Sequence, residues 1–311
     1  MLFDFSVAET GQDVFLIQDS GALETRHRWF VDSSYGRLTD VMVAAPPQLE
    51  IGPCSSPPVQ TLAQALTSNF QTASRQHSEL LRALRDQGVR CAQLPSSQKL
   101  PDLSFTRDAS LMTPWGLLAL RPCGGHRRKE PMHVVRHARG WGIPYLGAIE
   151  SGRIEGGDVC LLRPGVVAIG WSGERTDKEG ALALARLFEI RGWKAILTHF
   201  DPYFTHLDTL FAMAGRGRAV ACIEALDPSF IGQVEALGIK LLPVTPYEAQ
   251  RLGTSLLSLG DRRVLSCADN RRVNGELERL GYRVTTVELD QFTSSGGGVH
   301  CLTLPLARMP G

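Results

Sequence analysis

The sequence predicts an α/β protein in which five similar units close into a ring. The first basis is a junction, found five times, where a helical pattern ends at a glycine and a β-like run follows at once. The spacing of these junctions shrinks from about 54 to about 43 residues, a period found in propeller blades and other arrays. The junction glycines are Gly88, Gly142, Gly192, Gly238 and Gly281.

The second basis is the position of the reactive side chains. Clusters of them follow four of the junctions at a similar distance, about 13 to 20 residues. A repeated unit with its chemistry at one place in each copy implies that the copies converge on a single site. An open doubly wound sheet would also alternate strands and helices, but the regular recurrence of the clusters favours the ring. The clusters are Phe105-Thr-Arg-Asp108, Glu155-Gly-Gly-Asp158, His206-Leu-Asp208 and Gly296-Gly-Gly-Val-His-Cys301.

The chain begins with a segment that shows no clear period. We predict an N-terminal extension at residues 1–35 and a single domain at residues 36–311. A strand at residues 40–45 stops at two prolines, and a long amphipathic helix follows Pro57-Pro58 and ends near Gly88. The apolar positions at helical spacing in that helix are Leu62, Leu66, Phe70, Leu80 and Leu84.

Each later unit reads as helix, glycine, short strand, motif loop, strand, tight turn and strand. The strand–turn–strand segments are expected at residues 109–120, 159–169, 210–223 and 256–266. The last unit has a strand at residues 301–306 but no partner strand after it. The strand at residues 40–45 is free to supply that partner, which would close the ring with the two ends of the chain side by side.

Composition narrows the class of protein. With 43% apolar residues, 21% charged residues and a net charge of +1, the sequence offers no basic surface for nucleic acid or anionic membranes. Its seven cysteines are dispersed without a CxxC pair, which is typical of reduced thiols. Neither a signal peptide nor an apolar run of membrane-spanning length is evident. A cytoplasmic protein is therefore expected.

The reactive residues are weak signals one by one. Cys301 follows three glycines, which favours an accessible thiol, although a lone cysteine is more often an inert filler. His206 and Asp208 share one face of an extended segment, yet a structural histidine is the commoner explanation. Glu155 and Asp158 flank two glycines, as expected where a turn or a cation needs them.

Together the clusters indicate a cation-binding site. A metal site is an alternative, since histidine and carboxylates are ligands. The carboxylates outnumber what one zinc ion needs, and no two of these residues share a helical i, i+4 face, so we predict no metal and no cofactor. A planar guanidinium binds several carboxylates and has an electrophilic carbon that a thiolate can attack.

At this point the motifs resemble a known superfamily. The chain resembles the guanidino-group-modifying enzymes, or penteins, which include arginine deiminases, dimethylarginine dimethylaminohydrolases and amidinotransferases. The resemblance covers roughly residues 36–308 and implies a five-bladed α/β propeller of ββαβ units. Besides the four clusters, the matching motifs are Tyr35-Gly-Arg-Leu, Arg121-Pro with Arg127-Arg-Lys-Glu130, and Ser172-Gly-Glu-Arg175-Thr.

The resemblance also implies roles for the matching residues. Cys301 would be the nucleophile, His206 the acid and base, and Glu155 the residue that holds His206. Asp108 and Asp208 would clamp the guanidinium. The remaining residues expected to bind substrate are Arg127 and Arg175, as candidates for its α-carboxylate, together with Phe105, Gly156 and Asp158.

The predicted activity is hydrolysis of a C–N bond in the guanidino group of arginine or a methylarginine-like substrate, through a covalent amidino-thioether. The product would be of citrulline type, with ammonia or an alkylamine. Many dimethylarginine dimethylaminohydrolases carry lysine where Asp208 stands, so Asp208 favours a less substituted guanidinium. An amidinotransferase is the alternative; a non-catalytic propeller module and a metal-dependent hydrolase are more remote. The sequence leaves open the oligomeric state, a homo-oligomer included, and the role of residues 1–35.

Overall fold

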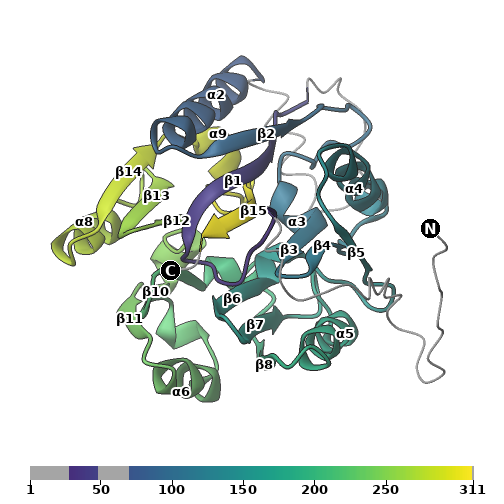
Figure 1. Cartoon of the computed structure of the whole chain (residues 1–311). Coiled ribbons are helices and arrows are strands. Elements are labelled where there is room, and N and C mark those ends of the chain that lie inside the picture. Colours follow the sequence, from purple (N-terminus) through teal and green to yellow (C-terminus); the bar gives the residue numbers. More distant parts are fainter. Residues whose placement is uncertain (1–27, 48–69, 310–311) are drawn as a thin grey trace.

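The computed structural model describes residues 28–47 and 70–309, which form five three-stranded sheets arranged around one centre (Figure 1). In each sheet one outer strand is antiparallel to the middle strand and the other is parallel to it. The five-bladed α/β propeller is thereby confirmed. By sheet, the strands are β15 (Leu304–Met309), β1 (Arg37–Ala44), β2 (Arg90–Leu94); β3 (Ser110–Thr113), β4 (Gly116–Ala119), β5 (Tyr145–Ala148); β6 (Val159–Arg163), β7 (Val166–Trp171), β8 (Lys194–His199); β9 (Phe211–Gly215), β10 (Arg218–Ala221), β11 (Lys240–Pro243); β12 (Leu256–Gly260), β13 (Arg263–Cys267), β14 (Arg283–Val287).

Helices cover the outside of the ring, where α2, α4, α5, α6 and α8 lie at the periphery in Figure 1. On α5, the side chains of Ala181, Leu184 and Phe188 are buried at helical spacing, which explains its packing against β7 and β8. The helices are α2 (Phe70–Asp86), α3 (Thr106–Ala109), α4 (Glu130–Gly140), α5 (Lys178–Glu189), α6 (Pro228–Ala236), α7 (Pro246–Gln250), α8 (Arg271–Arg279), α9 (Asp290–Thr293), and the 3₁₀ helices η1 (Gly125–Lys129), η2 (Gly156–Asp158), η3 (Leu207–Thr209), η4 (Ile223–Ala225).

The first and last strands of the described chain close the ring. Strand β15 pairs antiparallel with β1, with Arg37 opposite Met309 and Val41 opposite Pro305. The expected partner for the last unit is thus confirmed. The last strand starts at Leu304 rather than at residue 301, because a turn in which Leu302 N–H donates to the Gly298 carbonyl precedes it.

All five junction glycines have a positive φ, between +74° and +81°. A Cβ added at four of them would meet no heavy atom within 4 Å; at Gly281 it would approach the Arg262 side chain. The left-handed backbone, and not crowding, therefore requires glycine at the end of each helix. Each helix then turns directly into the outer parallel strand of its sheet, as the sequence pattern predicts.

Two predictions fall partly outside the described chain. The predicted long helix is present as α2, whereas its positions Leu62 and Leu66 lie outside the described residues. Within the predicted extension, Ser34 N–H donates to the Leu161 carbonyl in β6, and the Phe30 carbonyl accepts from Arg308 N–H in β15. The boundary at residue 35 stays a prediction. No helix in the described ranges has the length and apolar character to cross a bilayer.

Candidate active site

The four motif loops follow the outer strands β2, β5, β8 and β14 and meet at one end of the ring. They carry α3, η2, η3 and the glycine-rich loop before β15, and η2 contacts both α3 and η3. The fifth outer strand, β11, leads instead to two hydroxyl residues that support the others. Thr254 donates to the Asp208 carbonyl at 2.8 Å, and Ser255 Oγ accepts from His300 N–H.

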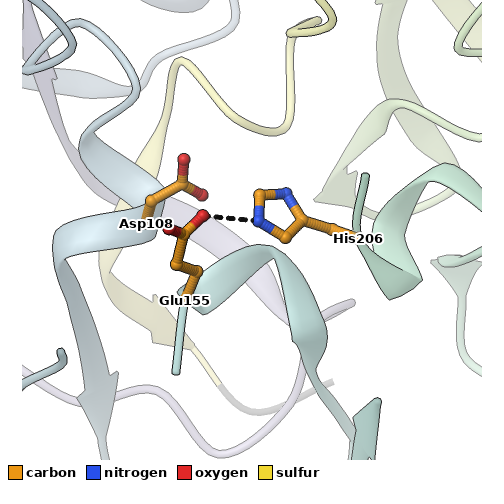
Figure 2. A group of neighbouring side chains, drawn as sticks. All are labelled: Asp108, Glu155 and His206. Atoms are coloured by element: carbon orange, nitrogen blue, oxygen red, sulfur yellow. Dashed lines mark hydrogen bonds and ion pairs between the residues drawn. The ribbon is translucent and has the colours of Figure 1, made fainter. Parts of the chain in front are cut away.

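His206, Glu155 and Asp108 form the centre of the site (Figure 2). The His206 ring and the Glu155 carboxylate face each other, with Nε2 2.6 Å from Oε2, and Asp108 lies beside them. All three side chains are buried. Burial alone would lower the pKa of His206, but the carboxylates of Asp108, Asp158 and Glu155 raise it to about 10. The ring is therefore an imidazolium at neutral pH.

Glu155 is held as an ionised carboxylate. Burial opposes its charge, but Arg175, Arg127 and His206 together lower the pKa of this carboxyl well below its usual range. Its Oε1 accepts from the N–H of Cys123 at 2.8 Å, and its Oε2 lies 3.5 Å from Arg175 Nη1 and 3.6 Å from Arg127 Nη1. Glu155 can thus orient His206 through a fixed charge.

The two arginines predicted to bind the substrate's carboxylate have different surroundings. Arg127 is 1% exposed, and its guanidinium donates to Asp108 Oδ2 at 3.1 Å and to Glu130 Oε2 at 3.0 Å. Its position is that of a support for the internal carboxylates. The Arg175 side chain is 23% exposed and is the one of the two that reaches solvent. Asp108 Oδ1 remains without a hydrogen-bond partner in the described part of the chain.

Cys301 lies beside the second aspartate. Its Sγ is 3.5 Å from Asp208 Oδ2, which also accepts from His300 Nδ1 at 2.7 Å. Burial, followed by the charges of Asp208 and Asp108, raises the pKa of the Cys301 thiol well above its ordinary value. Asp108 therefore acts on both the sulfur and the His206 ring, and without a ligand the sulfur is a protonated thiol.

The remaining predicted residues form the walls of the site. Gly156 packs against the Arg107 carbonyl, where a side chain would collide, and Gly297 packs in the same way on the Phe105 ring. Asp158 is fully buried and its Oδ1 accepts from the N–H of Leu207 at 2.7 Å, which fixes the start of η3. Phe105, Gly156 and Asp158 thus pack on or hold the motif loops, and their predicted binding of substrate stays a prediction.

Comparison with known proteins identifies the family of this chain. A family model described as eukaryotic N,N dimethylarginine dimethylhydrolase matches residues 59–308. The chain belongs to this family. The uncharacterized protein YkgA of Bacillus subtilis is 28% identical over 286 residues, 92% of this chain and 97% of that relative. The arginine deiminase of Mycobacterium marinum is 31% identical over 254 residues, which cover 68% of this chain and 62% of that enzyme.

Solved structures share the fold of this family member. A mutant of dimethylarginine dimethylaminohydrolase from Pseudomonas aeruginosa, complexed with citrulline, has a TM-score of 0.71 and 24% identity and covers 86% of this chain and 99% of its own. The N-terminal domain of ArgZ, a cyanobacterial arginine dihydrolase, in a mutant bound to substrate, has a TM-score of 0.73 and 17% identity over 86% of this chain and 98% of its own. At these identities the likeness establishes the pentein fold.

Sequence reasoning assigned no role to two side-chain pairs of this family member. His300 and Arg107 lie 2.8 Å apart in the interior, although both stand within quoted motifs. Their only sequence signal is that they precede Cys301 and Asp108. Nearer the surface, His126 Nε2 contacts Asp102 Oδ2 at 2.6 Å, and no sequence pattern pointed to that pair.

One group of donors could also hold a metal ion. Within residues 28–47 and 70–309, the one set of three histidine, cysteine or acidic donors close enough to share an ion is Asp108, Glu155 and His206, with atoms within 4.8 Å of one another. The metal-dependent alternative would therefore use the same side chains. In the present geometry the His206 nitrogen that faces the carboxylates is hydrogen-bonded to Glu155.

Proposed function

We propose that the protein hydrolyses a C–N bond in the guanidino group of arginine or a close relative, with Cys301 as the nucleophile. The observation that carries the proposal is a pair of buried contacts from separate blades, His206 with Glu155 and Cys301 with Asp208, with the charge of Asp108 acting on both the ring and the sulfur. Asp108 and Asp208 each keep one carboxylate oxygen without a hydrogen-bond partner among the described residues. A guanidinium, which only donates hydrogen bonds, fits such acceptors.

Substrate binding would prepare the nucleophile. Burial and the neighbouring carboxylates raise the pKa of the Cys301 thiol and so favour its protonated form. A bound guanidinium adds a positive charge beside the sulfur, which lowers the thiol pKa and favours release of its proton to solvent. The thiolate therefore forms in the substrate complex.

The first half of the reaction transfers the amidino group to the enzyme. The Cys301 thiolate attacks the central guanidino carbon and forms a C–S bond. Protonated His206 gives its proton to the departing nitrogen, and the C–N bond breaks with loss of ammonia or an alkylamine. Glu155 keeps the ring of His206 in place during this step, because its carboxylate is bonded to Nε2.

The second half restores the enzyme. Water attacks the amidino-thioether carbon, and His206, now neutral, accepts a proton from that water. The C–S bond breaks, Cys301 leaves as the thiolate, and the remaining hydroxyl proton is lost as the carbonyl of a citrulline-type ureido product forms. Once the product has left, the sulfur takes up one proton and returns to the thiol. One water is consumed for each ammonia or amine released, and the steps require no metal or cofactor.

The surroundings of the site favour an unsubstituted, arginine-like substrate. The Asp208 carboxylate beside the nucleophile needs N–H donors on the facing side of the guanidinium, and a methyl group offers none. Arg175, being partly exposed, is the candidate for the substrate's α-carboxylate, whereas Arg127 supports Asp108 and Glu130. The related arginine deiminase, and the dimethylarginine dimethylaminohydrolase structure complexed with citrulline, support this chemistry.

A substrate panel tests the proposal. Purified protein is incubated with arginine, monomethylarginine, dimethylarginine and agmatine, with and without an added amine, and ureido products are measured by colour. We expect a ureido product from arginine without the amine. A new guanidino compound that forms only with the amine would favour amidino transfer, and no turnover at all would favour a non-catalytic module.

Two further measurements test the mechanism. We expect Cys301→Ser to remain folded and to lose turnover, because serine is a much weaker nucleophile at this position. Full activity in that variant would rule out the covalent route. Loss of wild-type activity on treatment with a chelator, with recovery on adding a metal, would favour the metal-dependent alternative.

A further inference from the structure

Arg107 joins two motif loops that are far apart in the sequence. Its backbone N–H donates to the Cys301 carbonyl at 3.3 Å, its Nε donates to the His300 carbonyl at 3.4 Å, and its Nη2 lies 2.8 Å from His300 Nε2. Arg107 and His300 are only 6% and 9% exposed. All three contacts therefore lie in the interior, and they hold Arg107 against Cys301 and the residue before it.

The contact between the two side chains fixes the tautomer of His300. A guanidinium can only donate hydrogen bonds, so Nε2 of His300 must accept and carries no hydrogen. The hydrogen of the neutral ring is then on Nδ1, which donates to Asp208 Oδ2 at 2.7 Å. Burial and the charge of Arg107 lower the pKa of His300 to about 4, so the ring is neutral.

We propose that Arg107 and His300 are positioning residues that set the places of Cys301 and Asp208 for guanidinium attack. This inference rests on the proposed function. Arg107 precedes Asp108 on the α3 loop, and His300 precedes the nucleophile. Their bonds, here called the Arg107–His300 clasp, connect the loops of three blades. The clasp occupies Asp208 Oδ2 and leaves Oδ1 for the substrate.

The composition of the clasp argues against a purely structural role. Arg107 has no carboxylate within 4.0 Å among the described residues, although its guanidinium is buried. Burying a charge without an ion pair is costly, and apolar residues would join the same loops at less cost. The arrangement has a use if the site requires His300 to donate to Asp208, because the guanidinium of Arg107 fixes the tautomer in which it does so.

Two substitutions of His300 by amide residues test separately its hydrogen bond to Arg107 and its hydrogen bond to Asp208. Asparagine at position 300 places its amide nitrogen near the site of Nδ1, so His300→Asn keeps a donor for Asp208. Glutamine places its terminal group near the site of Nε2, so His300→Gln keeps a partner for Arg107 but no donor for Asp208. We expect kcat/KM to fall about 10- to 100-fold in His300→Gln, as for loss of a hydrogen bond to a charged group, and clearly less in His300→Asn.

A control and a double-variant cycle complete the kinetic test. His137→Gln, on α4 beside the tilted ring of Trp141, should leave kcat/KM unchanged. Arg107→Lys should reduce kcat/KM, and its effect should be less than additive with that of His300→Gln, because each breaks one link of the same chain of hydrogen bonds from Arg107 to Asp208. Additive effects would contradict the clasp, as would a folded His300→Gln with kcat/KM within about twofold of the wild type.

An alkylation assay separates failure of the clasp from failure of the proposed function. A chloroacetamide and the matching chloroacetamidine have the same shape, but the amidine carries a cation like that of a guanidinium. Each alkylates Cys301 when the thiolate displaces chloride. In the wild type the amidine should react faster, because Asp108 and Asp208 hold it beside the sulfur.

The two outcomes are distinguishable. Equal rates for the two reagents in the wild type would overturn the proposed function, whatever the clasp does. A wild-type preference that survives unchanged in folded His300→Gln would overturn the clasp alone. We expect the preference to be lost in His300→Gln and largely kept in His300→Asn, with urea midpoints close to that of the wild type.

Discussion

Replacing Gly157 with alanine should displace the His206 ring. A Cβ at Gly157 would lie 2.6 Å from His206 Nδ1 and 2.7 Å from Cγ. Ordinary contact begins near 3.4 Å, so the ring must retreat by about 0.8 Å. The φ of Gly157 is not positive, so alanine adds no backbone strain there. The perturbation is therefore a push on one side chain.

The ring has little freedom to yield to this push. Nε2 is bonded to Glu155 at 2.6 Å, and the backbone of the next residue is bonded to Asp158 at 2.7 Å. A displacement close to 1 Å in a catalytic group costs about 10²-fold in rate. We expect kcat/KM to fall by about that factor, with a loss of stability of about 1–3 kcal/mol from overpacking.

The assay is ureido product formation from arginine, with stability measured by urea unfolding. Gly232→Ala in α6 is the matched control, because a Cβ there meets nothing within 4 Å. In a helix that exchange should stabilise the protein by about 0.5–1 kcal/mol and leave kcat/KM unchanged. A folded Gly157→Ala protein with wild-type kcat/KM would refute the assignment of His206.

Three further outcomes follow from the charges of the site. Arg127→Met should lower the free energy of unfolding in urea by about 3–5 kcal/mol, because it leaves buried Asp108 and Glu130 unpaired. Arg175→Met, at a partly exposed position, should mainly raise KM. Equal destabilisation by the two variants would contradict the argument from burial. Folding raises the pKa of His206 to about 10, so the charged ring stabilises the folded protein fully below about pH 6.5, and this stabilisation is lost as the pH rises through 10. The difference in melting temperature between the wild type and His206→Gln should therefore shrink over that pH range. A constant difference would contradict the raised pKa. Thiolate absorbance of Cys301, with Cys301→Ser as the blank, should be missing near neutral pH and appear on adding a guanidino ligand; a thiolate in the free enzyme would contradict the raised pKa.

Local signals in the sequence were sufficient for the architecture. A glycine is required at these helix ends by the positive φ of that one residue, so the five junctions could be predicted without information on tertiary contacts. The start of the last strand could not be predicted in this way, since the turn after Gly298 depends on contacts of the glycine-rich loop with Phe105 and Ser255. Strand ends near the site are thus set by packing between blades.

The meeting of the motif loops was predictable, whereas the directions of their side chains were not. Recurring motif positions indicate which side chains meet, because equivalent loops share one end of a ring. The direction of each side chain was hidden: in Arg127-Arg128-Lys129 only the first residue points inward, and the three letters are chemically alike. The contact of Arg107 with His300 joins positions 193 residues apart, so no local pattern reports it.

The pairing of β15 with β1 has a consequence for how the enzyme is made. Strand β1 is synthesised long before its antiparallel partner β15, because Arg37 pairs with Met309. Cys301 stands just ahead of β15, so its sulfur can lie beside Asp208 only after the other four sheets have been synthesised. The four motif loops therefore assemble late, and a chain cut short before residue 301 lacks the sulfur beside Asp208.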